Sequence, residues 1–372
     1  MVKPASKWLR GLLRAGKAQQ RTASKLARVL FEPMTTKPLE KPRVRMPAAP
    51  ATSASPPAPG KWLTAHYAPL PELGQVPRRL PYFLYLPDKA PSQAMRSRGR
   101  PLLVMLHGCE QSATQFADGT RMNRLAERKG YAVLYPQQSL RAHARRCWKW
   151  YDRQTQDGGG DVGLIVGAIG QVAARYAIDP ARIYICGLSA GAGMAHLVAL
   201  NHPQLFAAVG LHSGPVFGAG HSVLGAMNVM QHGAPARVDS AIEEVLARQL
   251  LFPRLPMILL QGQADSVVRP VNQQQLVRQA IHVNRMPPET VITVENVPAS
   301  AAASAAGSRK RSHAYAVHDY QAGGEVLLRV IQIEQLEHAW SGGDASLPFN
   351  DRAGPDASRL LLDFFARHQR RR

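Results

Sequence analysis

Short apolar runs alternate along the chain with stretches in which apolar residues recur every three or four positions. The unbroken run within 101–106 predicts a strand that is buried on both faces. Further strands are predicted at 82–87, 131–136, 183–186, 205–213, 256–260 and 326–335, and helices at 122–129, 162–176 and 358–368. Strands that alternate with helices indicate an α/β fold with a mostly parallel central sheet and helices on both faces.

The apolar pattern begins near Lys61, and the preceding residues differ in composition. Residues 47–60 are rich in Pro, Ala and Ser, which is typical of a linker. We therefore expect a basic extension and linker at 1–60 and one catalytic domain at 61–372. A second Ala/Ser-rich stretch, 298–311, is predicted to be a solvent-exposed insertion.

Positive charge is concentrated at the N-terminus. The whole chain has a formal net charge of +21, and residues 1–45 hold 12 Lys and Arg against two Glu. Basic residues there recur at intervals of three and four, with a weaker apolar counterpart. An amphipathic helix that contacts a granule or another anionic surface and a disordered basic tail both fit this pattern. Nucleic acid is a weaker candidate partner, because no known recognition motif is present.

Cysteine usage and hydropathy bear on location and cofactors. Three cysteines do not form a disulfide framework, and no segment has the apolar core of a secretory signal or the length of a membrane span. We expect a cytoplasmic protein with Cys109 and Cys147 as free thiols, although the sequence does not decide whether the two meet. No Cys/His cluster has metal-ligand spacing, so no metal and no cofactor are expected.

The clearest chemical motif is the pentapeptide from Gly187 to Gly191, with Ser189 at its centre. A β-branched and aromatic run precedes it, and a small-residue helical pattern follows. This is the order of strand, sharp turn and helix that holds a nucleophilic serine with its hydroxyl exposed. Because the strand and helix flank it, we interpret Ser189 as a nucleophile rather than as an ordinary turn residue.

Other candidate catalytic groups follow other predicted strands. The turn His107-Gly108 leaves the buried strand 101–106, where such a hydrolase places an oxyanion donor, so the amides of Cys109 and Ala190 are the candidates. Asp265 follows strand 256–260 on a Gly-containing turn, where a triad carboxylate belongs. Capping of the following helix is its alternative role.

A histidine after the last predicted strand completes the order Ser, Asp, His. His338 lies in a loop from which an imidazole can approach Ser189. Three tryptophans near these motifs, Trp148, Trp150 and Trp340, are candidates for the wall of a substrate cleft. The aromatic cluster at 147–151 is equally compatible with a place in the core.

Together these motifs resemble the catalytic domain of polyhydroxyalkanoate depolymerases, within the wider group of feruloyl and acetylxylan esterase-like α/β-hydrolases. The resemblance runs from about Tyr82 to the C-terminus. Its motifs are Leu-His-Gly-Cys at 106–109, Cys-Trp-Lys-Trp at 147–150, Ile-Asp-Pro-Ala-Arg-Ile-Tyr at 178–184, Gly-Leu-Ser-Ala-Gly at 187–191, Gly-x-x-Asp-x-x-Val at 262–268 and His-Ala-Trp-x-Gly-Gly at 338–343.

The resemblance implies an α/β-hydrolase fold with Ser189 as nucleophile, Asp265 as orienting acid, His338 as general base and Cys109 at an oxyanion-hole amide. It implies a serine esterase that hydrolyses poly(3-hydroxybutyrate) or its oligomers, and we expect it to act inside the cell at storage granules. Gln261 stands where the family more often has His, a change expected to leave catalysis intact. A feruloyl or acetyl carbohydrate esterase is the nearest alternative, and a non-catalytic protein that binds surfaces or nucleic acid is a distant one.

Overall fold

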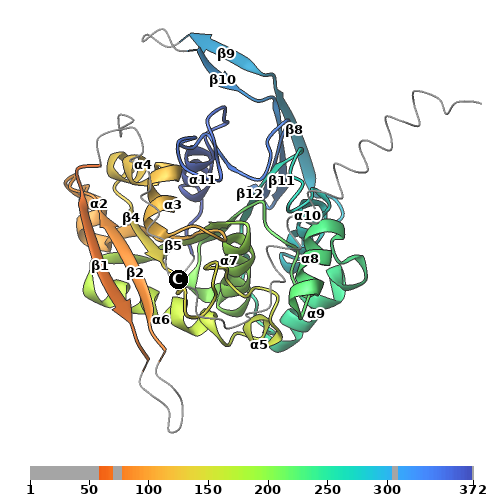
Figure 1. Cartoon of the computed structure of the whole chain (residues 1–372), viewed down its shortest axis with the longest axis horizontal. Helices are drawn as coiled ribbons and strands as arrows, with labels where there is room; N and C mark the ends of the chain where they lie inside the picture. The colour runs from red at the N-terminus through yellow and green to blue at the C-terminus, as the bar shows by residue number, and fades with distance from the viewer. Residues whose placement is uncertain (1–57, 70–77, 304–308, 371–372) are drawn as a thin grey trace, which may run out of the picture. The chain divides into compact units, whose positions relative to one another are not determined.

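The computed structural model describes residues 58–69, 78–303 and 309–370 (Figure 1). Within them, ten strands form one sheet in the order β1-β2-β4-β3-β5-β6-β7-β12-β11-β8. The strands are β1 (Lys61–Tyr67), β2 (Leu80–Leu86), β3 (Arg100–Leu106), β4 (Ala132–Pro136), β5 (Ile178–Leu188), β6 (Ala208–His212), β7 (Met257–Gly262), β8 (Val291–Val297), β11 (Tyr315–Ala322) and β12 (Glu325–Ile333). The whole sheet lies in one compact unit of the chain, residues 56–372.

The centre of the sheet is parallel and its two edges are antiparallel. Strands β4, β3, β5, β6, β7 and β12 pair in parallel, whereas β1 and β2 at one edge and β11 and β8 at the other pair antiparallel. The carboxyl ends of the parallel strands therefore meet at one edge of the sheet, which is where open α/β sheets carry their sites.

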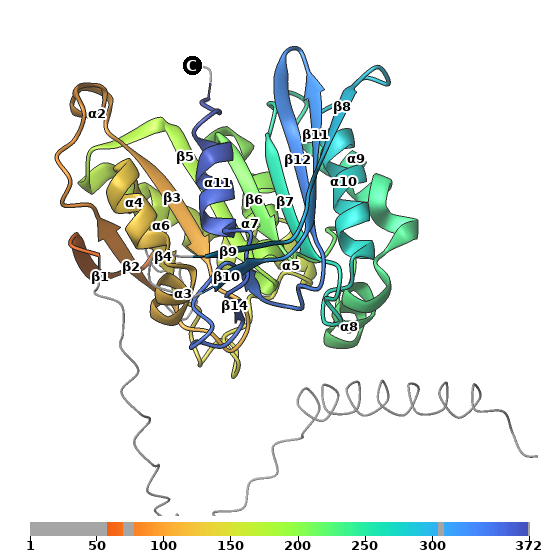
Figure 2. The ribbon, with the colours of Figure 1, turned by 90° about the horizontal axis from the view of Figure 1, so that it is seen from above.

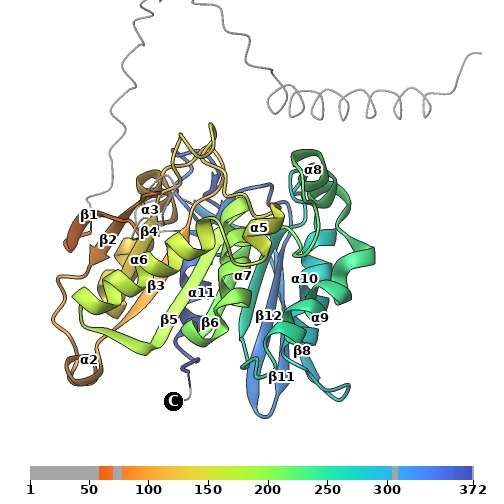
Figure 3. The same ribbon diagram turned by 90° about the horizontal axis from the view of Figure 1, so that it is seen from below.

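Helices cover both faces of the sheet. They are α2 (Gln93–Arg98), α3 (Ala113–Thr120), α4 (Met122–Lys129), α5 (Arg153–Gln156), α6 (Asp161–Arg175), α7 (Ala190–Asn201), α8 (Val223–His232), α9 (Val238–Arg248), α10 (Val271–Val283) and α11 (Ala357–Phe365). Figure 2 shows α3, α4 and α11 in front of the sheet, and Figure 3 shows α6, α7 and α9 in front of the opposite face.

Strand β3 explains why two layers of helices are needed. Residues 102–106 are completely buried, and alternate side chains enter different cores: Val104 packs with the α6 and α7 side, and Leu103 and Met105 pack with α3, α4 and α11. A strand whose two faces are both apolar requires cover on both sides. The predicted α/β-hydrolase architecture is thus confirmed.

Differences from the predicted elements concern their ends and the sheet edges. The strand predicted at 205–213 is shorter, because a 3₁₀ turn, Pro203–Leu205, precedes β6. The insertion at 298–311 contains two short paired strands, β9 (Ser300–Ala303) and β10 (Arg309–Ser312). The predicted extension at 1–60 lies outside the described residues except for its last three, so its boundary stays a prediction. No helix among the described residues is long and apolar enough to cross a membrane.

Candidate active site

Ser189 lies on the sharp turn between β5 and α7. Its backbone has φ 57° and ψ −122°, a positive-φ conformation that is strained for a residue with a side chain. Its N–H donates to the carbonyl oxygen of His212 at 2.9 Å, which fixes the turn against the end of β6. The geometry is that of the strand–turn–helix in which a serine nucleophile is presented.

Two glycines allow this turn to form. A Cβ atom on Gly191 would lie 2.1 Å from the carbonyl oxygen of Leu106, and one on Gly187 would lie 2.4 Å from the backbone of Gly191. Both contacts are with backbone, which cannot move aside as a side chain can. The spacing of glycines around Ser189 is therefore required by the close approach of α7 to β5 and β3.

Asp265 follows β7, and both of its carboxylate oxygens are occupied. Oδ1 accepts the N–H groups of Val267 and Val268, each at 2.9 Å, and Oδ2 accepts from His338 Nδ1 at 2.8 Å. Helix α10 begins only at Val271, so the alternative that Asp265 caps this helix is wrong. The carboxylate instead orients the imidazole of His338.

The electrostatics of Asp265 favour its ionised form. Burial raises the pKa of this carboxyl, but the hydrogen bond and charge of His338 and the amides of Val268 and Val267 outweigh that effect, so the pKa lies below its usual value. The Asp265 side chain is fully buried, and that of His338 is 11% exposed. A buried carboxylate thus holds an imidazole that reaches the surface.

The predicted catalytic residues follow strands that end at the same edge of the sheet. Asp265 and His338 are in direct contact, and Ser189 lies at the end of β5, two strands away from β7 in the sheet order. His212, at the end of the intervening β6, links the two sides. Its carbonyl accepts the Ser189 N–H, and its Nε2 accepts the N–H of Ser341 at 3.3 Å.

The predicted oxyanion donors border the Ser189 turn. A Cβ on Gly108 would lie 3.6 Å from Cβ of Ser189, so the loop after β3 abuts the nucleophile. Within the described residues, the backbone N–H groups of Cys109 and Ala190 have no hydrogen-bond partner. Two unpaired amides beside a serine hydroxyl are what a developing oxyanion requires.

The three tryptophans belong to the core rather than to the wall of a cleft. Trp148, Trp150 and Trp340 are 0%, 5% and 1% exposed. The Trp148 indole donates to the carbonyl of His107 at 3.0 Å, and the Trp340 indole donates to Ser358 Oγ at 3.1 Å. Indoles need a partner for their N–H when they are buried, and these two find it in the loop after β3 and in helix α11. The interpretation of these residues as cleft walls is therefore wrong.

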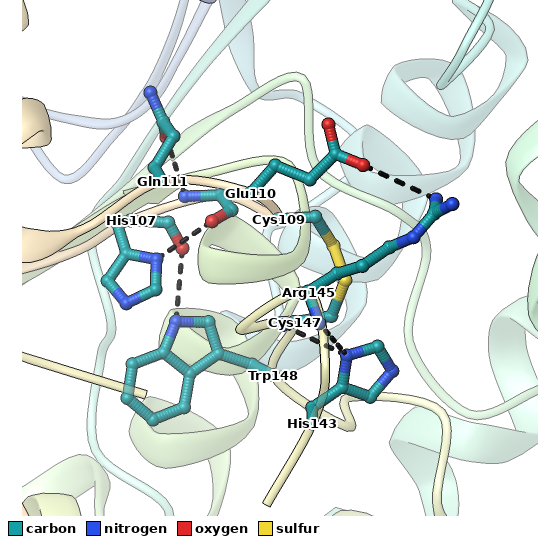
Figure 4. Close-up of a disulfide and its surroundings, with 9 residues drawn as sticks. His107, Cys109, Glu110, Gln111, His143, Arg145, Cys147 and Trp148 are labelled. Carbon is teal, nitrogen blue, oxygen red and sulfur yellow. Dashed lines mark hydrogen bonds and ion pairs between the residues drawn. A yellow bond between two sulfur atoms is a disulfide. The ribbon is translucent and has the colours of Figure 1, made fainter. Parts of the chain in front are cut away.

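Cys109 and Cys147 form a disulfide, so the expectation of two free thiols is wrong (Figure 4). The two residues are 38 positions apart in the sequence, and the loops after β3 and β4 bring them together. Cys186 is a free cysteine, buried in β5, and burial raises the pKa of its thiol. The bond places a covalent link beside the proposed oxyanion amide.

Two further residues at the site were not predicted. Gln261 donates through Nε2 to Asp265 Oδ2 at 3.1 Å and to the Val268 carbonyl at 2.9 Å. The position at which a change was expected to leave catalysis intact is thus in direct contact with the candidate orienting carboxylate. His212 is fully buried, and its ring stacks on Trp340. The position of Gln261 at the end of β7, four residues before Asp265, could have indicated this contact from the sequence. No comparable sequence feature marks His212.

Metal ligation has no support in this part of the chain. Across residues 58–69, 78–303 and 309–370, no group of three or more His, Cys, Asp or Glu side chains is placed to hold a metal ion. The chemistry available at the sheet edge is a hydroxyl, an imidazole, a carboxylate and two free amides. This set suits nucleophilic attack on an acyl carbon.

Comparison with models of protein families matches residues 80–293 to the esterase PHB depolymerase family. The chain belongs to this family. The matched residues include Ser189 and Asp265 but end before His338. The position of His338 therefore rests on the geometry of the structure.

Curated relatives carry several activities in their names. Poly(3-hydroxyalkanoate) depolymerase C of Paucimonas lemoignei is 29% identical over 211 residues, which cover 55% of this chain and 49% of that protein. Feruloyl esterase B of Thermothelomyces thermophilus is 30% identical over 158 residues, which cover 42% of this chain and 51% of that protein. The chain thus spans about half the length of these relatives.

A solved structure supports the fold. The acetyl xylan esterase from Aspergillus awamori has a TM-score of 0.57 at 19% identity, covering 77% of this chain and 94% of that one. At this identity the likeness establishes the α/β-hydrolase fold and no more.

Proposed function

We propose that the protein is a serine esterase that hydrolyses poly(3-hydroxybutyrate) or its oligomers. The observation that carries the esterase assignment is the Asp265–His338 hydrogen bond at the sheet edge where the strained turn presents Ser189. Membership of the esterase PHB depolymerase family supports the ester as the bond cleaved. The polyester substrate is supported by a relative named as a poly(3-hydroxyalkanoate) depolymerase.

The mechanism follows from the groups that the structure brings to this edge. His338 holds its Nδ1 proton toward Asp265, so Nε2 is left to accept the proton of Ser189 as Oγ attacks the ester carbonyl. The amides of Cys109 and Ala190 stabilise the oxyanion, with about 2.7–4 kcal/mol typical for one such donor. His338 then protonates the leaving alcohol, and water releases the hydroxyacid. The mechanism needs no cofactor.

The test is release of 3-hydroxybutyrate from amorphous poly(3-hydroxybutyrate) granules, with wild type measured beside Ser189→Ala. We expect release by wild type and its loss in the variant, with p-nitrophenyl butyrate hydrolysis lost in parallel. Wild type that leaves the polyester intact but cleaves p-nitrophenyl butyrate through Ser189 would refute the polymer assignment and retain the esterase. Hydrolysis unaffected by Ser189→Ala would refute the esterase mechanism itself.

A feruloyl or acetyl ester on carbohydrate is the second candidate substrate. Relatives named feruloyl esterase B and acetylxylan esterase A favour it, at identities similar to those of the depolymerases. Turnover numbers on methyl ferulate, acetylated xylan and amorphous polyester, measured on one preparation, distinguish the two. A higher kcat/KM on either carbohydrate-type ester would displace the polyester proposal.

The place of action is a separate proposal. Contact with a polyester granule through the basic residues 1–45 is compatible with their charge, and these residues lie outside the described part of the chain. Cosedimentation with granules should be lost when residues 1–60 are removed, and equal binding would refute the contact. The cytoplasmic location stays a prediction, and the Cys109–Cys147 bond counts against it because such bonds persist mainly in oxidising compartments.

A further inference from the structure

The loop that carries the proposed oxyanion donor, residues 107–111 (the oxyanion loop), is held by a second segment, residues 138–148 (the clamp segment). On the N-terminal side of Cys109, the clamp segment contacts His107 twice. The N–H of Gln138 donates to His107 Nε2 at 3.1 Å, and the Trp148 indole donates to the His107 carbonyl at 3.0 Å. The position of the chain before Cys109 is therefore fixed from both ends of the clamp segment.

The same segment holds the other side of Cys109. The N–H of Glu110 donates to the Arg145 carbonyl at 2.6 Å, and the two side chains form an ion pair at 3.4 Å. Glu110 has φ 64°, a left-handed conformation that requires support from its surroundings. The backbone bond to Arg145 supplies such support directly after the donor residue.

The disulfide connects the two segments at Cys109 itself. Figure 4 shows the Cys109–Cys147 bond between the His107–Trp148 contact and the Glu110–Arg145 contact. Within the clamp segment, His143 Nδ1 accepts the N–H groups of Arg145 and Cys147 at 3.3 and 3.4 Å. These hydrogen bonds hold the clamp segment in a turn, and the disulfide attaches the oxyanion loop to that turn.

We propose that the clamp segment and its disulfide position the Cys109 amide, so that turnover depends on the oxidised bond. The inference rests on the proposed esterase function. An oxyanion donor acts only when it lies about 2.7–3.1 Å from the developing charge, and a displacement of about 1 Å can lower a rate by about 100-fold. Hydrogen bonds on either side of Cys109 limit its movement, and the covalent bond fixes its distance from the clamp segment.

The redox step balances with an external dithiol. A dithiol reductant transfers two electrons and two protons, becomes a cyclic disulfide, and leaves Cys109 and Cys147 as two thiols. Reoxidation by a disulfide oxidant reverses the change. Because Cys186 is buried and bears no bond to either partner, it takes no part in the cycle.

The test compares oxidised, reduced and reoxidised wild type on p-nitrophenyl butyrate, with thiols counted under native conditions. We expect two additional thiols on reduction, a fall in kcat of about 10- to 100-fold, KM within about threefold, and recovery on reoxidation. Rates are expressed per active site, by titration to completion with a fluorophosphonate, so that unfolded protein does not enter kcat. Activity of the oxidised enzyme tests the esterase function, and its change on reduction tests the inference.

Variants separate the bond from other effects of the reductant. Cys147→Ala should have a low kcat with or without reductant, and Cys186→Ala, which keeps the bond, should behave as wild type. If Cys147→Ala does not fold, Cys109→Ala/Cys147→Val, which restores apolar contact, replaces it. A kcat per active site that is unchanged in the fully reduced enzyme, or a loss confined to KM, would overturn the proposal.

Discussion

At the scale of single residues, hydrogen bonds occupy both carboxylate oxygens of Asp265. Its two oxygens accept from the amides of Val267 and Val268, from Gln261 and from His338. A group that is acceptor-only meets four donors here. Because an ionised carboxylate only accepts hydrogen bonds, the proposed mechanism has His338 donate through Nδ1 to Asp265 and use Nε2 toward Ser189.

We expect Asp265→Asn to lower kcat by about 1,000- to 10,000-fold. An amide has only one acceptor oxygen, which cannot accept both from His338 and from the N–H groups of Val267 and Val268. Its NH₂ group must face either His338 Nδ1, which selects the wrong tautomer, or the N–H groups of Val267 and Val268. Steady-state kinetics on p-nitrophenyl butyrate measures the effect.

Asp363→Asn is the matched control for this substitution. Asp363 is an exposed carboxylate on α11 that pairs with Lys129, and removing its charge should change kcat by less than about twofold. Asp265→Asn with near wild-type kcat would contradict the role assigned to Asp265.

The residues predicted from the sequence are those whose role follows from the strand they terminate. Ser189, Asp265 and His338 each follow a predicted strand, and parallel strands bring their ends to one edge. Gln261 could have been found, because it contacts Asp265 only four residues further along the chain. His212 was missed because its role arises from contacts between different elements. The Cys109–Cys147 bond was missed for a similar reason, since it depends on how two loops approach in space.

At the scale of elements, the close approach of α7 to β3 determines how tightly the nucleophile turn is built. We expect Gly191→Ala to destabilise the fold by about 1–3 kcal/mol or more, because the added Cβ would meet the Leu106 carbonyl oxygen at 2.1 Å. Activity per folded molecule should also fall, because any relief of that contact moves Ser189. Urea unfolding measures the change in the free energy of unfolding.

Gly163→Ala provides the comparison. Gly163 lies within α6, and a Cβ there would meet no atom within 4 Å. Alanine is favoured over glycine in a helix by about 1 kcal/mol, so this variant should be slightly more stable than wild type and equally active. Equal stability of the two variants would show that the approach of α7 to β3 does not limit stability.

The central elements could be predicted because their apolar runs are unbroken, whereas the edges could not. Strand β8 is exposed along nearly its whole length, including Val291, Ile292 and Val294. Without a buried face it has no alternating pattern, and it forms a strand because β11 supplies its backbone partners. A pairing between strands that are separated in the sequence leaves no signal in a short stretch of residues.

At the scale of the whole molecule, packing on both sides of the sheet buries several histidines, and burial favours their neutral form. Burial lowers the pKa of His107 to about 4, and that of His196 and of His212 to about 3. His107 and His212 use their ring nitrogens in hydrogen bonds. Both ring nitrogens of His196 lack a hydrogen-bond partner among the described residues, and its ring packs edge-on against Phe217.

These histidines should make the fold sensitive to mild acid. A histidine has a pKa of about 6.5 when unfolded, so between pH 6.5 and the lowered folded values the unfolded chain binds protons that the folded chain does not. The free energy of unfolding is therefore highest above pH 6.5 and should fall as the pH decreases, by up to about 1.4 kcal/mol per pH unit for each such histidine. Asp265, whose pKa is also lowered, adds to the loss only near and below about pH 4.

Urea unfolding at intervals from pH 7 to 4.5 measures how steeply the free energy of unfolding changes with pH. The substitution His196→Leu removes one buried imidazole without breaking a hydrogen bond, so it should reduce this slope by the contribution of one histidine. A free energy of unfolding that is constant over this range, or an unchanged slope in His196→Leu, would mean that these imidazoles become protonated without unfolding the protein.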